Sequence, residues 1–282
     1  MNALSVDKDV LGLFDRVVRR RLEPIDPSWR VESADEAIRA IGPTPSPFDN
    51  SLCWAQIDAA HADEIIREQV GFFRGLGRDF MWKVYSHDAP GDLEERLVRF
   101  GFELLERVKL AVLETSRPPS PVELPPGVRL EEVAEPSGLA PLIEVQRTVW
   151  ERDYGWLLAA LSEEMTARPE RLNVFVGWAE AAPVCSGWVR FAIGSPFGSL
   201  WGGAVRPEFR RKGLYRAMVA ARTEVARRRN VPYVYAEAGE MSWPILERLG
   251  FRALADVAKC IYRGDRLAPD DRSRRAPVEA GN

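Results

Sequence analysis

Hydrophobic and polar positions follow two periods along this 282-residue chain, one typical of short strands and one of amphipathic helices. In the second half the pattern predicts strands at 128–133, 172–179, 185–193 and 198–205, and helices at 137–150, 155–167 and from 214 onward. In the first half it predicts helices at 7–22, 33–40, 60–76 and 92–100, and strands at 51–57, 80–86 and 107–113. Helices and strands that intermingle in this way indicate an α/β or α+β fold with a mixed sheet.

The two halves of the chain share a repeated pattern. Gly101-Phe102 and Gly250-Phe251 lie 149 residues apart. The same offset aligns three further pairs, which are Leu97 with Leu246, Arg99 with Arg248 and Val108 with Val257. A repeat of this length predicts a duplicated fold.

Composition shifts mark the boundaries of the predicted domains. Residues 115–127 contain five prolines and few apolar residues, which predicts a stiff linker between domains at 1–114 and 128–263. The segment 264–282 is polar and contains proline, which predicts a disordered tail.

The junction after the strand at 198–205 carries the clearest chemical pattern. The strand ends in Ala204 and Val205, and a basic turn of Arg210, Arg211 and Lys212 leads to Gly213 and a helix. A glycine there lets backbone N–H groups approach a ligand, and the first N–H groups of a helix favour an anion such as pyrophosphate. A basic, solvated surface turn is the alternative interpretation.

The wider context resembles the GNAT superfamily of acyl-CoA-dependent N-acyltransferases over residues 128–262. Its signature, Gln/Arg-x-x-Gly-x-Gly/Ala, matches Arg210 and Gly213, whereas Tyr215 departs from the small last position. The resemblance implies tandem GNAT-like folds, with acetyl-CoA as co-substrate. It implies these coenzyme-binding residues: Ala204, Val205, Arg210, Arg211, Lys212, Gly213, Leu214 and Tyr215.

The corresponding junction of the first half lacks the anion-binding pattern. Where the second half has Arg-Arg-Lys-Gly, the first has residues 59–64, which include His61, Asp63 and Glu64. Two carboxylates at the start of a helix would repel a pyrophosphate. We therefore predict a degenerate first copy that binds no coenzyme and lacks some of the usual opening elements.

Acyl transfer to an amine needs a proton acceptor for the amine and a proton for the leaving thiolate. The tyrosine that many GNAT members use as an acid is replaced by Leu246, and no carboxylate lies at 198–205. Glu237 is the best candidate base and Glu240 the second, although a solvated carboxylate is an equal alternative for each. Tyr215 and Ser242 are candidate proton donors, and for Ser242 a helix cap is the favoured alternative.

The resemblance places the acceptor site between the first two helices and the central strands. The candidates there are the helix junction and one strand residue, namely Trp150, Glu151, Asp153, Tyr154 and Trp201. Aromatic walls with two carboxylates suit an amine on a partly apolar molecule. Trp178, Trp188 and Trp201 can be core residues instead, which is the favoured interpretation for Trp188. Gly202-Gly203 is a candidate bulge in the central strand.

Composition narrows the remaining possibilities. A net charge of −3, two histidines and three scattered cysteines argue against a nucleic-acid surface, a metal site and a disulfide framework. The absence of an apolar run long enough for a membrane span or signal peptide predicts a cytoplasmic protein. Cys185 and Cys260 fall in buried-strand patterns, which makes a covalent cysteine intermediate unfavourable.

The sequence thus predicts an N-acetyltransferase that acts by direct attack of a small amine on acetyl-CoA. Its acceptor and oligomeric state are not readable from the sequence. A non-catalytic acyl-CoA-binding or scaffolding protein is the main alternative, because the usual tyrosine and strand carboxylate are missing. A purely structural tandem is a weaker third interpretation.

Overall fold

A computed structural model describes residues 3–24, 28–34, 37–151 and 153–264. The predicted disordered tail therefore lies, apart from Gly264, outside the described residues. Contacts divide the chain into two compact units: one runs to residue 108 and includes the segment from 254 onward, and the other spans 109–253.

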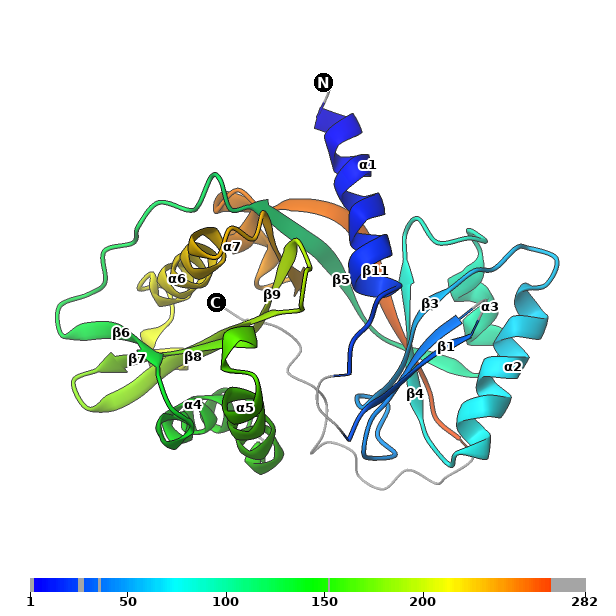
Figure 1. Ribbon diagram of the computed structural model, residues 1–282, viewed down its shortest axis with the longest axis horizontal. Helices are drawn as coiled ribbons and strands as arrows, with labels where there is room; N and C mark the ends of the chain where they lie inside the picture. Colours follow the sequence, from blue (N-terminus) through cyan, green and yellow to red (C-terminus); the bar gives the residue numbers. More distant parts are fainter. Residues whose placement is uncertain (1–2, 25–27, 35–36, 152, 265–282) are drawn as a thin grey trace. The chain divides into compact units, whose positions relative to one another are not determined.

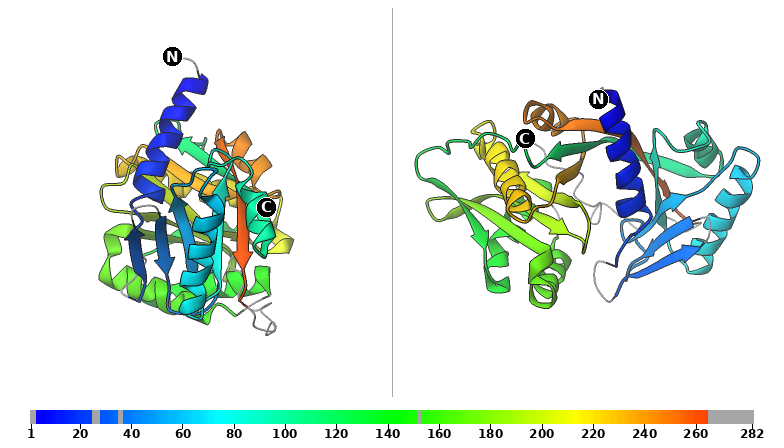
Figure 2. Two further views of the ribbon diagram at one scale, coloured as in Figure 1. Left: turned by 90° about the vertical axis from the view of Figure 1, so that its right-hand side faces the viewer. Right: turned by 45° about the horizontal axis from the view of Figure 1, so that its top comes forward.

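The second unit is a twisted sheet with helices on both faces (Figures 1 and 2). Its strands are β6 (Val128–Val133), β7 (Leu172–Ala179), β8 (Ala182–Phe191), β9 (Phe197–Val205), β10 (Tyr233–Ala238) and residues 109–114 of β5 (Phe102–Glu114). They lie in the order β5-β10-β9-β8-β7-β6, and only β9 and β10 run parallel.

Two helix pairs cover the two faces of this sheet. The first pair is α4 (Ala140–Trp150) and α5 (Gly155–Ala167), and the second is α6 (Leu214–Arg228) and α7 (Trp243–Arg248). Short 3₁₀ turns occur at Pro136–Leu139, Pro169–Arg171 and Pro207–Phe209. Each face has its own apolar core, so the central strand β8 is buried on both sides.

The first unit repeats this plan with fewer elements. Its strands are β1 (Arg30–Ala34), β2 (Ala37–Ile41), β3 (Asn50–Ala55), β4 (Phe80–Tyr85) and residues 254–262 of β11 (Arg252–Tyr262). Its helices are α1 (Ala3–Phe14), a π-helical turn (Asp15–Arg19), α2 (Ala62–Gly75) and α3 (Leu93–Arg99). The strand order is β1-β2-β3-β4-β11, again with a single parallel pair, β3 and β4.

The predicted helix at 33–40 is wrong, because the described residues of this segment lie in two antiparallel strands. β1 pairs with β2 from Arg30 opposite Ile41 to Ala34 opposite Ala37. Every residue of β2 is buried, and the Arg39 guanidinium donates to Gln69 at 2.7 Å. Burial in a sheet here outweighs the helical propensity of the local sequence.

The predicted fold class and its duplication are confirmed by the matching strand orientations of the two units. The final strands, however, do not follow the predicted domains 1–114 and 128–263. Residues 109–114 pair with β10 in the second unit, and residues 257–262 pair with β4 in the first. Each unit is thus completed by a strand that comes from the other half of the sequence.

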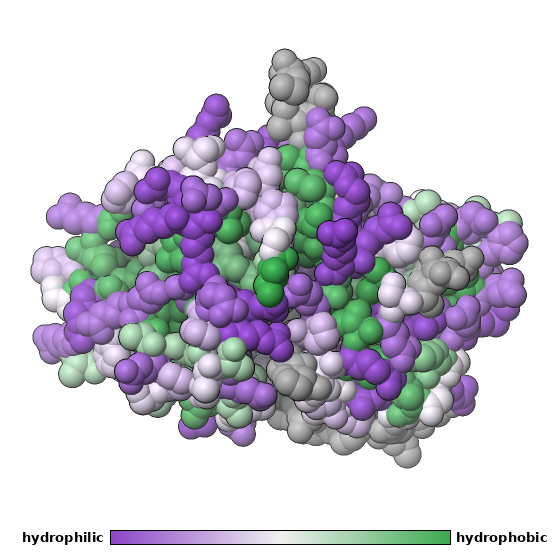
Figure 3. All heavy atoms as spheres, in the orientation of Figure 1, coloured by the Kyte–Doolittle hydropathy of each residue, from purple (hydrophilic) through white to green (hydrophobic). Residues whose placement is uncertain are grey.

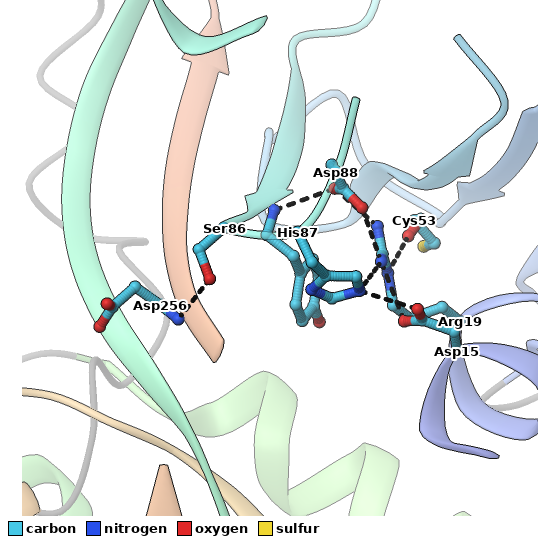
Figure 4. A network of polar contacts seen from close by, with 8 residues as sticks. Asp15, Arg19, Cys53, Ser86, His87, Asp88 and Asp256 are labelled. Atoms are coloured by element: carbon cyan, nitrogen blue, oxygen red, sulfur yellow. Dashed lines mark hydrogen bonds and ion pairs between the residues drawn. The ribbon is translucent and has the colours of Figure 1, made fainter. Parts of the chain in front are cut away.

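A buried arginine organises the polar centre of the first unit (Figure 4). Arg19, 4% exposed, donates to Asp15 at 3.0 Å, to Asp88 at 2.8 and 2.9 Å, and to the carbonyl of Cys53 at 3.3 Å. His87 lies 2.8 Å from Asp15. Burial disfavours the Asp15 carboxylate, but the hydrogen bond with His87 and the charge of Arg19 outweigh it and lower the Asp15 pKa.

Hydrophilic side chains cover most of the face shown in Figure 3, and apolar ones form small patches between them. Among the described helices, none is both long and apolar enough to cross a membrane.

Candidate active site

The two parallel strands at the centre of the second unit separate at their carboxyl ends. β9 pairs with β10 from Phe197 opposite Tyr233 to Ser199 opposite Tyr235. Within these fully described strands the pairing stops there, although β9 continues to Val205 and β10 to Ala238. Both strands therefore offer backbone groups to a ligand lying between them.

A glycine turn follows β9 and opens α6. Gly213 stands at the N-cap position with φ = +84°, a left-handed conformation that favours glycine. α6 is 15 residues long, so its first N–H groups and its dipole present positive potential at this turn. A phosphate or pyrophosphate suits such a site.

The predicted basic residues of the turn have different positions. Arg210 turns back and donates from Nε to the carbonyl of Val205 at 3.3 Å, whereas Arg211 and Lys212 are exposed. The Lys212 ammonium lies 4.8 Å from the ring centre of Phe209. Val122 of the proline-rich segment covers part of the turn, since its γ-carbon lies 3.1 Å from the position of a Cβ on Gly213.

Ala204, Val205 and Leu214 are buried beside the turn, so only their backbone groups are available to a ligand. Tyr215 is 6% exposed and packs in the core cluster of this face. Its large side chain, which departs from the family signature, is therefore accommodated in the core.

The predicted bulge in the central strand is present. Ser186 pairs with Ala204 and Trp188 with Trp201, so two residues of β9 lie opposite one residue of β8. Gly202 has φ = +58°, and a Cβ there would lie 1.8 Å from the Trp188 ring. Only glycine fits this position, because Trp188 occupies the space of any side chain.

Two side chains that the sequence analysis missed hold the bulge. Arg222 of α6, 1% exposed, donates from Nη1 to the carbonyls of Trp188 at 3.2 Å and Trp201 at 3.0 Å. Gln146 of α4 donates to the carbonyl of Gly202 at 2.6 Å. Since α4 and α6 cover opposite faces, the bulged backbone is fixed from both sides.

Arg222 is a buried cation. Burial lowers its pKa to about 10, and no carboxylate among the described residues forms an ion pair with it. One sequence signal could have identified Arg222. The helical period of α6 places this charged residue on the buried face of the helix, where an apolar residue is expected.

The predicted proton-transfer residues lie on different faces. Val234 and Ala238 of β10 pack in the core beneath α6, so strand alternation places Glu237 on the opposite face. Ser242 is 2% exposed, and the structure does not support the capping alternative: its hydroxyl makes no cap bond and donates to the carbonyl of Gly239 at 3.4 Å. Glu240 is exposed beyond the strand end.

The predicted acceptor residues gather at the α4–α5 junction, except for Trp201. Trp150 donates to Gln146 at 3.1 Å, and Glu151, with φ = +52°, ends α4. Asp153 accepts the backbone N–H of Gly155 at 3.0 Å, and Tyr154 is buried.

Trp201 of β9 is 41% exposed, whereas Trp188 is 2% exposed and belongs to the core of the α4–α5 face. The core alternative for Trp188 is therefore confirmed. An ion pair that the sequence analysis missed lies nearby: Arg190 of β8 donates from Nε to Glu164 of α5 at 2.8 and 3.1 Å.

The predicted burial of two cysteines is confirmed. Burial raises the pKa of Cys185 and of Cys260 to about 12, so both thiols stay protonated near neutral pH. Neither is therefore an activated nucleophile. Within the described parts of the chain, no cluster of His, Cys, Asp and Glu side chains has the grouping of a metal site.

Comparisons with known proteins agree with this geometry. Residues 139–251 match the sequence model of the acetyltransferase (GNAT) family. No curated protein sequence matches the chain.

Solved structures resemble both units together. A GCN5-related N-acetyltransferase from Kribbella flavida superposes with a TM-score of 0.68 at 17% identity, covering 89% of this chain and 96% of that one. A tandem GNAT protein from the clavulanic acid biosynthesis pathway gives 0.61 at 13% identity, covering 93% and 95%. A functionally unknown conserved protein from Staphylococcus epidermidis gives 0.61 at 14% identity, covering 88% and 98%. These similarities establish the fold, and the match at residues 139–251 shows that the chain carries a domain of the acetyltransferase (GNAT) family.

Proposed function

We propose that the second unit is an acyl-CoA-dependent N-acetyltransferase that acylates a small amine by direct attack. The observation that carries the proposal is the separation of β9 from β10 directly ahead of the Gly213 turn. The gap suits the extended pantetheine arm, and the turn suits the pyrophosphate of the coenzyme. Val205, Arg211, Lys212 and Gly213 would hold that end of acetyl-CoA.

The bulged backbone of β9 would then face the thioester. An extra residue in a strand leaves backbone groups outside the ladder, and N–H groups aimed at the carbonyl oxygen stabilise the charge that develops there. Arg222 and Gln146 restrict this segment, so its donors are fixed before the substrate binds.

Acyl transfer then needs a proton acceptor for the amine and a proton donor for the thiolate. The neutral amine nitrogen forms a bond to the thioester carbon while the carbon–sulfur bond breaks. The nitrogen gives up one proton to the acceptor, and the leaving thiolate takes one from the donor. Glu237, on the same face as Trp201, is the proposed proton acceptor, directly or through water. Tyr215 and Ser242 are the proposed proton donors to sulfur.

Acceptor binding is assigned to the α4–α5 face. Trp150, Glu151, Asp153, Tyr154 and Trp201 would surround the amine, with Trp201 offering an exposed ring. The first unit is proposed to bind no coenzyme.

The test is thermal unfolding of the full chain with acetyl-CoA, free CoA and longer acyl-CoAs. A ligand that binds only the folded state raises the unfolding midpoint. At a concentration one hundred times its Kd, it adds about 2.7 kcal/mol to the free energy of unfolding. Release of free thiol with an amine panel then separates an enzyme from a binding protein. A rise in the midpoint without thiol release would favour the non-catalytic alternative, and no rise would contradict the coenzyme site.

A further inference from the structure

The α5 side of β8 carries an arginine with a fixed orientation. Arg190 donates from Nε to both carboxylate oxygens of Glu164, and the two side chains are 20% and 7% exposed. A bond to both oxygens from one nitrogen, at a nearly buried carboxylate, leaves the guanidinium little freedom to swing. Arg190 is therefore a preorganised group.

The two terminal nitrogens of Arg190 remain available. Among the described residues, its only partners are Glu164 and the rings of Trp188 and Trp201, whose centres lie 5.7 and 6.0 Å from the guanidinium carbon. A guanidinium carries five N–H donors, and Nε uses one. Four donors thus have no hydrogen-bond partner among the described residues, at a partly exposed position.

This arginine lies close to the proposed reaction centre. Arg190 pairs with Ser199, the residue at which β9 leaves β10, and Trp201 lies two positions further along β9. Trp201 is 41% exposed, so a ligand that touches its ring can also reach the terminal nitrogens of Arg190. Glu237 is on the same face of the neighbouring strand β10.

Arg190, Glu164 and Trp201 together favour a ligand with a singly charged anionic group. Planar guanidinium nitrogens bind a carboxylate through two parallel hydrogen bonds. Glu164 already balances the charge of Arg190, which disfavours a second partner of high charge such as a phosphate dianion. The exposed indole of Trp201 adds an apolar surface for the rest of the molecule.

We propose that the acceptor is an amino acid or a closely related molecule with both an amine and a carboxylate, and that Arg190 binds that carboxylate. The amine then faces the thioester while the carboxylate fixes the orientation of the acceptor. This carboxylate site rests on the proposed acyl transfer, yet the two can be tested separately.

The experiment compares acceptors that differ in one group. The full-length protein is offered acetyl-CoA with a panel of amino acids and with the carboxamide of each, and thiol release gives kcat/KM. The amine of a carboxamide is the less basic of each pair, so more of it is neutral, and basicity alone would favour the carboxamide. We expect the best acids to exceed their amides by about ten- to a hundredfold, as for one hydrogen-bonded charge.

Substitutions at Arg190 identify the origin of that preference. R190Q should reduce the acid-to-amide ratio to about one, mainly through KM, and R190K, which keeps the charge without the planar fork, should give an intermediate ratio. R129Q is the matched control, because Arg129 also pairs with a glutamate and lies 5.3 Å from a tryptophan ring, on β6. A ratio near one in the wild type, or an unchanged ratio in R190Q, would overturn the proposal.

A binding measurement covers the case in which no amine releases thiol. Calorimetry with CoA present compares the N-acetylated amino acids with their N-acetylated carboxamides, in wild type and R190Q. Tighter binding of the acids by the wild type alone would support the carboxylate site although the proposed reaction had failed. Equal binding of acids and amides, or no binding of either, would overturn the site whatever the turnover shows.

Discussion

The turn between β9 and α6 in the second unit carries exposed cations and Gly213. The corresponding turn between β3 and α2 in the first unit carries a carboxylate, Asp58. There Asp58 accepts the backbone N–H groups of Ala60 at 2.9 Å and His61 at 2.8 Å, and it also contacts the His61 ring at 2.9 Å. Two backbone donors directly ahead of α2 are thus occupied by a carboxylate of the chain. One architecture therefore ends in an open glycine turn, the proposed coenzyme site, in one unit and in a turn closed by its own carboxylate in the other.

The irregular strands of the two units, β3 and β9, are each held by a buried arginine, but the two arginines differ in their carboxylate partners. In the first unit β3 also has an irregular register, and the carbonyl of Cys53 at that point accepts from buried Arg19. Arg19 has two aspartate partners, whereas no carboxylate of the described chain pairs with Arg222. A cation without a counter-ion costs stability, and such costs are tolerated where the charge has a functional use.

The largest expected effect is loss of coenzyme binding when the glycine turn is filled. In G213V, a β-branched side chain at positive φ should abolish the acetyl-CoA-induced rise in the unfolding midpoint and cost on the order of 1–3 kcal/mol of stability. G127V is the matched control, since Gly127 also has positive φ (+76°) but has open space around it. The turn assignment fails if G213V keeps the full acetyl-CoA response.

Removing the arginine behind the bulge should have the next largest effect, on turnover rather than on binding. R222M leaves the carbonyls of Trp188 and Trp201 without their donor, so we expect kcat to fall by roughly ten- to a hundredfold while the acetyl-CoA response persists. T223V is the control: Thr223 is the neighbouring buried residue of α6, and its hydroxyl has no hydrogen-bond partner in the described chain. Equal kcat in R222M and T223V would show that Arg222 has no role in positioning the bulge.

Introducing a carboxylate into the second turn should make it resemble the first. K212E reverses an exposed charge beside Gly213, so the Kd for acetyl-CoA should rise about tenfold at low salt and less at high salt, because salt screens exposed charges. K83E, an exchange on β4 of the first unit, provides a control for net charge. A Kd that does not depend on Lys212 at any ionic strength would exclude the Lys212 charge from coenzyme binding.

The smallest effect is expected from opening the first turn. The hydrogen bond with His61 lowers the pKa of Asp58 from its usual 3.8, so Asp58 stabilises the fold above about that pH and loses this effect as the pH falls below it. D58A should therefore melt slightly below the wild type at pH 7, with a smaller difference in acid. It should keep the acetyl-CoA response of the wild type unchanged, and a second, additional binding event would show that the carboxylate alone keeps the first unit from binding coenzyme.

The sequence predicted most of the second unit because its signals are local. A glycine before a helix, Gly202-Gly203 inside a strand and the periodicity of α6 each act within a few residues. Arg190 and Arg222 could not be predicted as interacting groups, because their partners lie on other elements, 26 and 34 residues away for Glu164 and Trp188. The predicted helix at 33–40 failed for the same reason, since pairing and burial in the sheet decide the conformation of β1 and β2.

The exchange of final strands has a consequence for synthesis of the chain. β4 can pair with β3 early but obtains its second partner only when residues 257–262 have been made, so the first unit keeps an open sheet edge for on the order of ten seconds or more at ordinary rates of translation. An open edge is a site for pairing with other chains. A fragment that ends after the proline-rich segment would keep this edge permanently, so the synthesis of residues 257–262 decides when the edge of the first unit is covered.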